Sequence, residues 1–76
     1  MKVAELIAKL QAFPPELEVV QSKDGEGNDF SPTADVVGGV YASENTWSGE
    51  FTDVEEDAVE MTERGGIAAV CLWPTN

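Results

Sequence analysis

The sequence contains no histidine, one cysteine and four basic residues among 76. Without histidine, neither a Ser-His-Asp triad nor a Cys-His pair can form, which excludes the common nucleophilic hydrolases. The single cysteine, Cys71, permits neither an intramolecular disulfide nor a cysteine zinc cluster, and a free thiol suits a reducing compartment. No pattern of residues specifies a reaction, and we therefore expect a protein that is not an enzyme and needs no cofactor.

The sequence also lacks an apolar stretch of about 18 residues, the length that a membrane-spanning helix requires. Its first residues place Lys2, Glu5 and Lys9 within an amphipathic pattern, which is not typical of a signal peptide. Four basic residues against fifteen acidic ones give a net charge of −11, which disfavours binding to nucleic acid or to an anionic membrane. The composition predicts a soluble, cytoplasmic protein whose partner is basic, either a cationic protein or a metal cation.

Apolar residues make up 42% of the chain, enough for one small core, which predicts a single domain over residues 1–76. The clearest periodicity lies at the start, where apolar residues recur at intervals of three and four and predict a helix over residues 2–13. Its apolar face consists of Val3, Leu6, Ile7, Leu10 and Phe13. Pro14 and Pro15 end this helix because neither has a backbone N–H to donate.

Three segments are predicted to be strands: residues 16–21, residues 33–42 and Ile67–Trp73. The last is a run of seven residues without a polar side chain, bounded by glycines and a proline, and this predicts a central strand buried on both faces, with Cys71 inert inside it. The Gly38-Gly39 pair in the second strand predicts a bulge, a bend or a close backbone approach.

Residues 52–63 fit a short helix, because Val54, Ala58 and Met61 are spaced by four and three residues. They fit a mobile acidic loop equally, because these apolar residues lie among carboxylates. Phe30 and Trp47 are expected to pack back onto the sheet. The predicted fold is α+β, with one N-terminal helix packed on a small, mainly antiparallel β-sheet and with a long acidic loop or short helix.

Residues 44–63 contain eight carboxylates and no lysine or arginine. Folded over a twisted sheet, such carboxylates can approximate the phosphate spacing of a nucleic-acid strand and attract a cationic DNA-binding groove. An aromatic side chain among the charges would slow dissociation. The hypothesis is therefore a DNA mimic that binds a basic, nucleic-acid-handling protein. Its expected partner-binding residues are Glu44, Trp47, Glu50, Asp53, Glu55, Glu56, Asp57 and Glu60.

Three alternatives remain open from the residues alone. The charge also fits a solvated surface that serves solubility, and an open sheet edge or uncovered face fits an assembly module that forms a homodimer. A calcium-binding module is the third alternative, because Asp24, Glu26 and Asn28 follow the odd-position spacing of an EF-hand loop. However, Asp29 and Asp35 occupy the positions where that loop has glycine and glutamate, and an Asp-Gly turn between strands explains the segment Asp24–Asp29 equally well.

Most of the chain outside the acidic segment resembles small uncharacterised accessory proteins of tailed bacteriophages. The resemblance rests on the opening helix, on Pro14-Pro15 followed by Glu18-Val19-Val20, on the segment Ser22–Pro32 and on the ending Leu72–Asn76. It implies a phage protein that acts in the host cell, of the acidic kind that inhibits host enzymes. It also implies the candidate targets, which are uracil-DNA glycosylase, restriction enzymes and CRISPR effectors.

Overall fold

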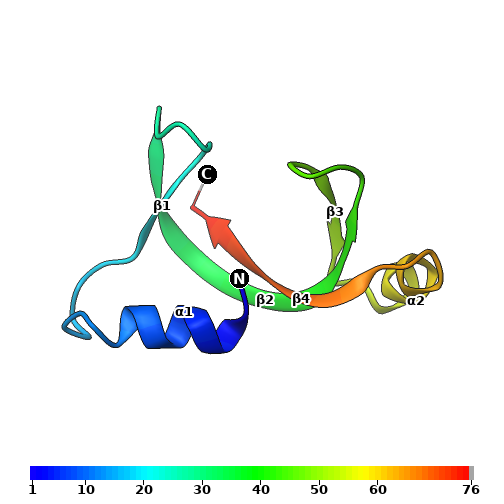
Figure 1. Cartoon of the computed structure of the whole chain (residues 1–76), viewed down its shortest axis with the longest axis horizontal. Coiled ribbons are helices and arrows are strands. Elements are labelled where there is room, and N and C mark those ends of the chain that lie inside the picture. The colour runs from blue at the N-terminus through cyan, green and yellow to red at the C-terminus, as the bar shows by residue number, and fades with distance from the viewer. Residues whose placement is uncertain (76) are drawn as a thin grey trace. The chain divides into compact units, whose positions relative to one another are not determined.

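The structure is a computed structural model that describes residues 1–75. Its elements are helix α1 (Val3–Leu10), strands β1 (Val20–Ser22), β2 (Phe30–Ser43) and β3 (Gly49–Thr52), helix α2 (Glu55–Glu63) and strand β4 (Ile67–Pro74) (Figure 1). The strands form a four-stranded antiparallel sheet, so the expectation of an α+β fold with an N-terminal helix is confirmed. The chain divides into two compact units: unit 1 comprises Met1–Thr33 and the residues from Pro74 onward, and unit 2 comprises Ala34–Trp73.

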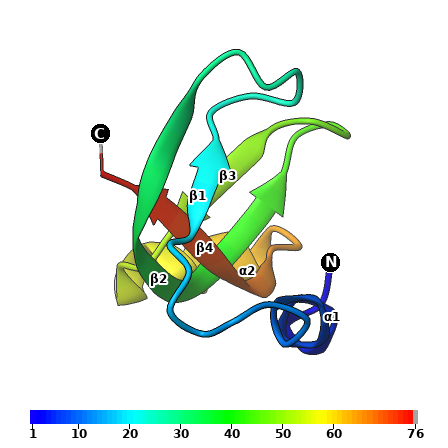
Figure 2. The same ribbon diagram turned by 90° about the vertical axis from the view of Figure 1, so that its left-hand side faces the viewer.

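Strand β2 organises the sheet, because β1, β3 and β4 all pair with it. It is 14 residues long and is the long green strand in Figure 1 and Figure 2. In unit 1 its first residues pair with β1, with Gln21 opposite Ser31. In unit 2 its last residues pair with β3, with Tyr41 opposite Phe51. The prediction that Ile67–Trp73 is the central strand is therefore wrong, although this segment does form strand β4.

In unit 1, helix α1 ends at Leu10 rather than at the predicted residue 13. The chain continues there as a tighter turn, in which Phe13 donates its backbone N–H to the carbonyl oxygen of Leu10, three residues earlier, at 3.1 Å. Pro14 then follows and cannot continue the helix. The C-terminal end of the chain is fixed by Ser31, whose Oγ accepts the backbone N–H of Thr75 at 3.1 Å. Ser31 is the buried polar residue of unit 1, and strand β1 is shorter than the predicted strand 16–21.

In unit 2, helix α2 packs on strand β3, and Met61 is its buried residue, with 4% of its surface exposed. The helix ends at Glu63, and Gly65 two residues later has a φ of 94°, which lets the N–H of Gly66 return to the carbonyl oxygen of Met61 at 2.8 Å. The rings of Phe51 and Trp73 meet edge to face, with centroids 6.5 Å apart. Residues 52–63, for which the sequence allowed a helix or a loop, are thus largely helical.

Strand β4 is not buried on both faces, and this corrects the prediction for Ile67–Trp73. Ile67 is 64% exposed, Val70 and Trp73 are also exposed, and the thiol-bearing Cys71 is only partly buried. Phe30 is likewise exposed rather than packed on a core. A run of apolar residues indicates that both faces of a strand are hydrophobic, but it does not indicate that another layer of the protein covers these faces.

Candidate functional site: the acidic surface of unit 2

All of the predicted partner-binding residues lie in unit 2. This unit carries nine carboxylates against a single basic residue, Arg64, and so has a net charge of −8. Unit 1 carries six carboxylates and three lysines, which gives a net charge of −3. The negative charge is therefore concentrated on the hairpin of β2 and β3, on helix α2 and on the turn between them.

Helix α2 and strand β3 together line an acidic hollow of about 310 Å³. Glu50 enters it from β3, while Asp57 and Glu60 enter it from α2. Arg64 lines the same hollow, but across residues 1–75 the one salt bridge lies elsewhere, between Lys23 and Asp29 at 3.4 Å. The structure therefore brings these three carboxylates together without pairing them to a cation.

The first turn of α2 carries three exposed carboxylates, Glu55, Glu56 and Asp57. Negative charge at a helix N-terminus is favourable because the unpaired backbone N–H groups there carry partial positive charge. The turn before the helix is fixed by Thr52, whose Oγ1 accepts the N–H of Val54 at 3.1 Å. Glu55 and Glu56 do not line the hollow, nor does Asp53, which precedes the helix. They extend the acidic surface beyond it.

Trp47 lies at the tip of the hairpin between β2 and β3 and is 83% exposed. The prediction that it packs on the sheet is therefore wrong. The reason is Asn45, whose Oδ1 accepts hydrogen bonds from the backbone N–H groups of Trp47 at 2.9 Å and Ser48 at 2.7 Å. This arrangement fixes a compact turn with Trp47 on its outer side, and Glu44 begins the same turn by donating its N–H to the carbonyl oxygen of Ser48.

Asn45 is the residue of this site that sequence reasoning missed. Asparagine side chains commonly accept backbone N–H groups two or three residues ahead and so stabilise turns. An asparagine followed two residues later by an aromatic, among small polar residues, is the signal that was available. The same reasoning would have predicted a tight turn ahead of strand β3 (Gly49–Thr52), which is not among the three predicted strands.

The segment considered for calcium is an ordered turn between β1 and β2. The carboxylate of Asp24 accepts the N–H of Glu26 at 2.8 Å, the N–H of Asn28 at 3.2 Å and the side-chain amide of Asn28 at 3.1 Å. These bonds, the Asn28 side chain above all, hold the pKa of Asp24 below its usual value. Within residues 1–75, no three acidic, histidine or cysteine side chains are placed to hold a metal ion together.

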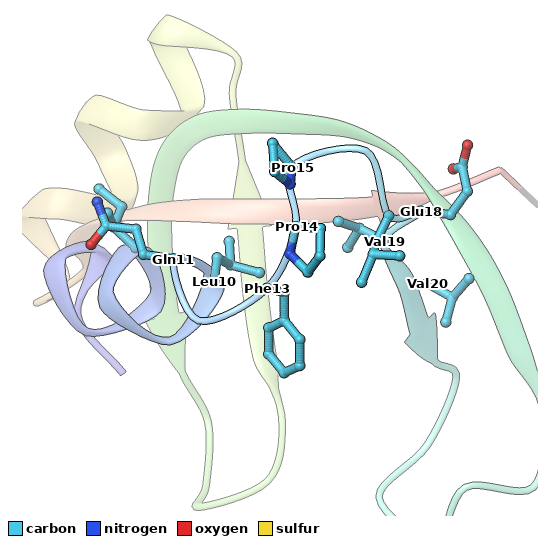
Figure 3. A pocket seen from close by; sticks show the side chains of 10 residues that line it. Leu10, Gln11, Phe13, Pro14, Pro15, Glu18, Val19 and Val20 are labelled. Carbon is cyan, nitrogen blue, oxygen red and sulfur yellow. The ribbon is translucent and has the colours of Figure 1, made fainter.

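A second hollow, in unit 1, was not predicted. It is an open apolar groove of about 770 Å³ between helix α1 and the segment that leads into β1, and Figure 3 shows its side chains. The groove is lined mainly by apolar residues: Ile7, Leu10, Gln11, Phe13, Pro14, Pro15, Leu17, Glu18, Val19 and Val20. We refer to these residues as the α1 groove. It lies in the less charged of the two units and holds none of the predicted partner-binding residues.

Comparison of the chain with protein-family models, with curated proteins and with solved structures finds no match. Neither helix of residues 1–75 has the length and apolar character needed to cross a lipid bilayer.

Proposed function

We propose that this protein is a non-catalytic inhibitor that binds the nucleic-acid-binding groove of a basic protein by presenting carboxylates in place of phosphates. The observation that carries the proposal is the surface of unit 2. This unit has nine carboxylates and only one arginine, and its exposed tryptophan projects from a fixed turn. Glu44, Glu50, Asp53, Glu55, Glu56, Asp57 and Glu60 provide the charge, and Trp47 provides the apolar anchor.

The two kinds of residue have separate roles. Unpaired carboxylates create a negative potential that accelerates the encounter with a cationic groove and is weakened by salt. Charge at the edge of an interface contributes mainly to the association rate, whereas a buried aromatic residue slows dissociation. Trp47 is suited to slow dissociation because its turn is already ordered, so little conformational entropy is lost when a partner covers it.

The fixed geometry of α2 and β3 also supports mimicry. A duplex presents charge at regular intervals on a stiff backbone, and carboxylates on a mobile chain would lose entropy on binding. Here Asp57 and Glu60 lie on a helix and Glu50 lies on the strand that packs against it. The resemblance to phage proteins selects the first targets to examine, which are bacterial uracil-DNA glycosylase, restriction enzymes and CRISPR effectors.

The test is to titrate each purified target with the protein by fluorescence anisotropy, in competition with its duplex or guide-bound DNA. The expected result is a one-to-one complex with one target, which DNA displaces and whose Kd rises steeply between low and physiological salt. The triple variant Glu55→Gln, Glu56→Gln, Asp57→Asn should weaken this binding by about tenfold or more, because ion pairs at such interfaces couple by 1.5 kcal/mol or above.

The matched control removes three charges from unit 1 instead, as Glu16→Gln, Glu18→Gln, Glu26→Gln. It should leave the affinity within about twofold, because none of these charges belongs to the proposed binding surface and exposed charges outside an interface are largely screened by salt. Far-UV circular dichroism on both variants checks that the helical content of the parent is retained. If both triple variants bind as the parent does at every salt concentration, or if DNA does not compete, the mimicry proposal is wrong.

A further inference from the structure

Strand β4 begins in one compact unit and ends in the other. Its residues Ile67–Trp73 belong to unit 2, whereas Pro74 and the following Thr75 belong to unit 1. Strand β2, with which β4 pairs, makes the same passage after Thr33. Whatever holds Thr75 within unit 1 therefore also restrains the last residues of β4, because the backbone between them is continuous.

Thr75 is held by Ser31 and by Pro32, two consecutive residues of β2. Its backbone N–H is shared between two acceptors, the Oγ of Ser31 at 3.1 Å and the carbonyl oxygen of Pro32 at 3.1 Å. The hydroxyl oxygens of Ser31 and Thr75 also lie within hydrogen-bond distance, at 3.2 Å. Ser31 is only 2% exposed, so its hydroxyl depends on these partners rather than on water.

Pro74 increases the importance of this contact. Proline has no backbone N–H and cannot donate to a neighbouring strand, so the N–H of Thr75 is the next donor along the chain after that of Trp73. The other end of β4 is held within unit 2, where the N–H of Gly66 binds the carbonyl oxygen of Met61 at 2.8 Å. The C-terminal end of β4 thus depends on the contact that Thr75 makes.

We propose that the Ser31–Thr75 contact is a clasp that controls how readily β4 separates from β2, starting at its C-terminal end. Proteins open locally in contiguous segments, and the least restrained end of a strand opens first. Opening there separates the ring of Trp73 from that of Phe51, whose centroids lie 6.5 Å apart in the closed state. Because Phe51 follows Glu50 on β3, opening also loosens the strand that lines the acidic hollow. The clasp itself does not depend on the proposed function.

The test is native-state hydrogen exchange, followed by NMR, on the full chain and on the variant Ser31→Ala. This substitution removes the hydroxyl and leaves the carbonyl oxygen of Pro32 to accept the N–H of Thr75. The slowly exchanging amides of β4 should exchange about fivefold faster or more, the effect of losing one or two hydrogen bonds. The acceleration should be largest next to Pro74 and smallest next to Ile67.

Ser43→Ala is the matched control. Ser43 lies at the other end of β2, and its Oγ also donates to a backbone carbonyl oxygen, that of Asn45 at 2.7 Å. This variant should leave the exchange of β4 within about twofold of the parent. Helix α2 provides an internal control in the Ser31→Ala variant. Local opening of β4 leaves the exchange of the α2 amides within about twofold, whereas a loss of global stability accelerates all slow amides alike.

If Ser31→Ala does not fold, Thr75→Val serves instead, because valine keeps the β-branched shape and replaces only the hydroxyl by a methyl group. It should accelerate the same amides in the same order, by about two- to fivefold. Equal acceleration of β4 and α2 would overturn the proposal, since the contact would then support the whole fold rather than one strand end. So would exchange of β4 that the clasp variants leave unchanged, or that Ser43→Ala accelerates as much as Ser31→Ala does.

Discussion

The side-chain Oδ1 of Asn45 accepts the backbone N–H of Ser48 at 2.7 Å, and this contact determines where Trp47 points. Asn45→Ala removes the acceptor and leaves the N–H groups of Trp47 and Ser48 to water. We expect their amide hydrogens to exchange roughly tenfold faster, which corresponds to about 1.4 kcal/mol, the upper range for a net hydrogen bond. Hydrogen exchange followed by NMR measures this directly.

Asn45→Asp is the matched control, because a carboxylate retains the acceptor oxygen. It should keep the slow exchange of both amides. Equal exchange rates in the alanine and aspartate variants would show that the backbone bonds of the hairpin, and not the Asn45 side chain, fix the turn.

Trp47→Ala should separate binding from stability. Trp47 is exposed, so its removal should change the free energy of unfolding by less than about 0.5 kcal/mol. If Trp47 anchors the partner, the same change should weaken the complex by about 30-fold, the 2 kcal/mol expected of an interface hot spot. Chemical denaturation and the competition titration measure the two quantities, and a loss of stability without a loss of affinity would place Trp47 in the structure rather than in the interface.

Gly38 and Gly39 should respond differently to alanine. A Cβ at Gly39 would overlap the carbonyl oxygen of Thr52 and the ring of Phe51 on the neighbouring strand, whereas a Cβ at Gly38 would meet nothing within 4 Å. Gly39→Ala should therefore destabilise the fold by about 1–3 kcal/mol, the usual cost of overpacking. Gly38→Ala should be neutral or slightly stabilising, since it only restricts the unfolded chain. Thermal melts at one protein concentration compare the two variants.

The turn between β1 and β2 should lose its stabilisation in acid. Hydrogen bonds from the Asn28 side chain and from backbone N–H groups hold the pKa of Asp24 below 3.8. A lowered folded-state pKa means that the stabilisation is complete above pH 3.8 and is lost as the pH falls through the lower, folded-state value. Asn28→Ala should raise the pKa of Asp24 toward 3.8, as measured by the carboxyl ¹³C shift.

Asp29 provides the internal control for that titration. Its pKa is also lowered, first by the N–H of Phe30 and then by Lys23, and neither contact involves Asn28. Asp29 should therefore titrate unchanged in the Asn28→Ala variant. A shift of both residues together would mean that the whole turn unfolds when Asn28 is lost.

Several elements could be predicted because local rules determine them. The spacing of Val3, Ile7 and Leu10 predicted helix α1, and the apolar run from Ile67 predicted strand β4. The close approach at Gly39 was among the alternatives that the double glycine predicted, since glycine is tolerated where another backbone passes within the reach of a Cβ. Helix α1 and strand β4 are determined by residues that are neighbours in sequence. Glycine at position 39 has one structural role, which is to permit the close approach.

Burial could not be predicted in the same way. Ile67, Phe30 and Trp47 are all hydrophobic, and from the sequence each was expected to be covered, yet all are exposed. Whether a hydrophobic residue is covered depends on which layer lies over it, and that layer can belong to another chain. The hairpin strand β3 was missed for a related reason, since its four residues are too few to show a periodicity.

The three carboxylates in the first turn of α2 have a consequence for the evolution of this protein. Gathering like charges for binding ordinarily opposes stability, and selection must balance the two. Here Glu55, Glu56 and Asp57 lie where a helix favours negative charge, so, if they bind a partner as proposed, selection for folding and selection for affinity favour the same side chains. On that proposal, a lineage that loses its target should retain this acidic turn, while drift removes the exposed tryptophan first.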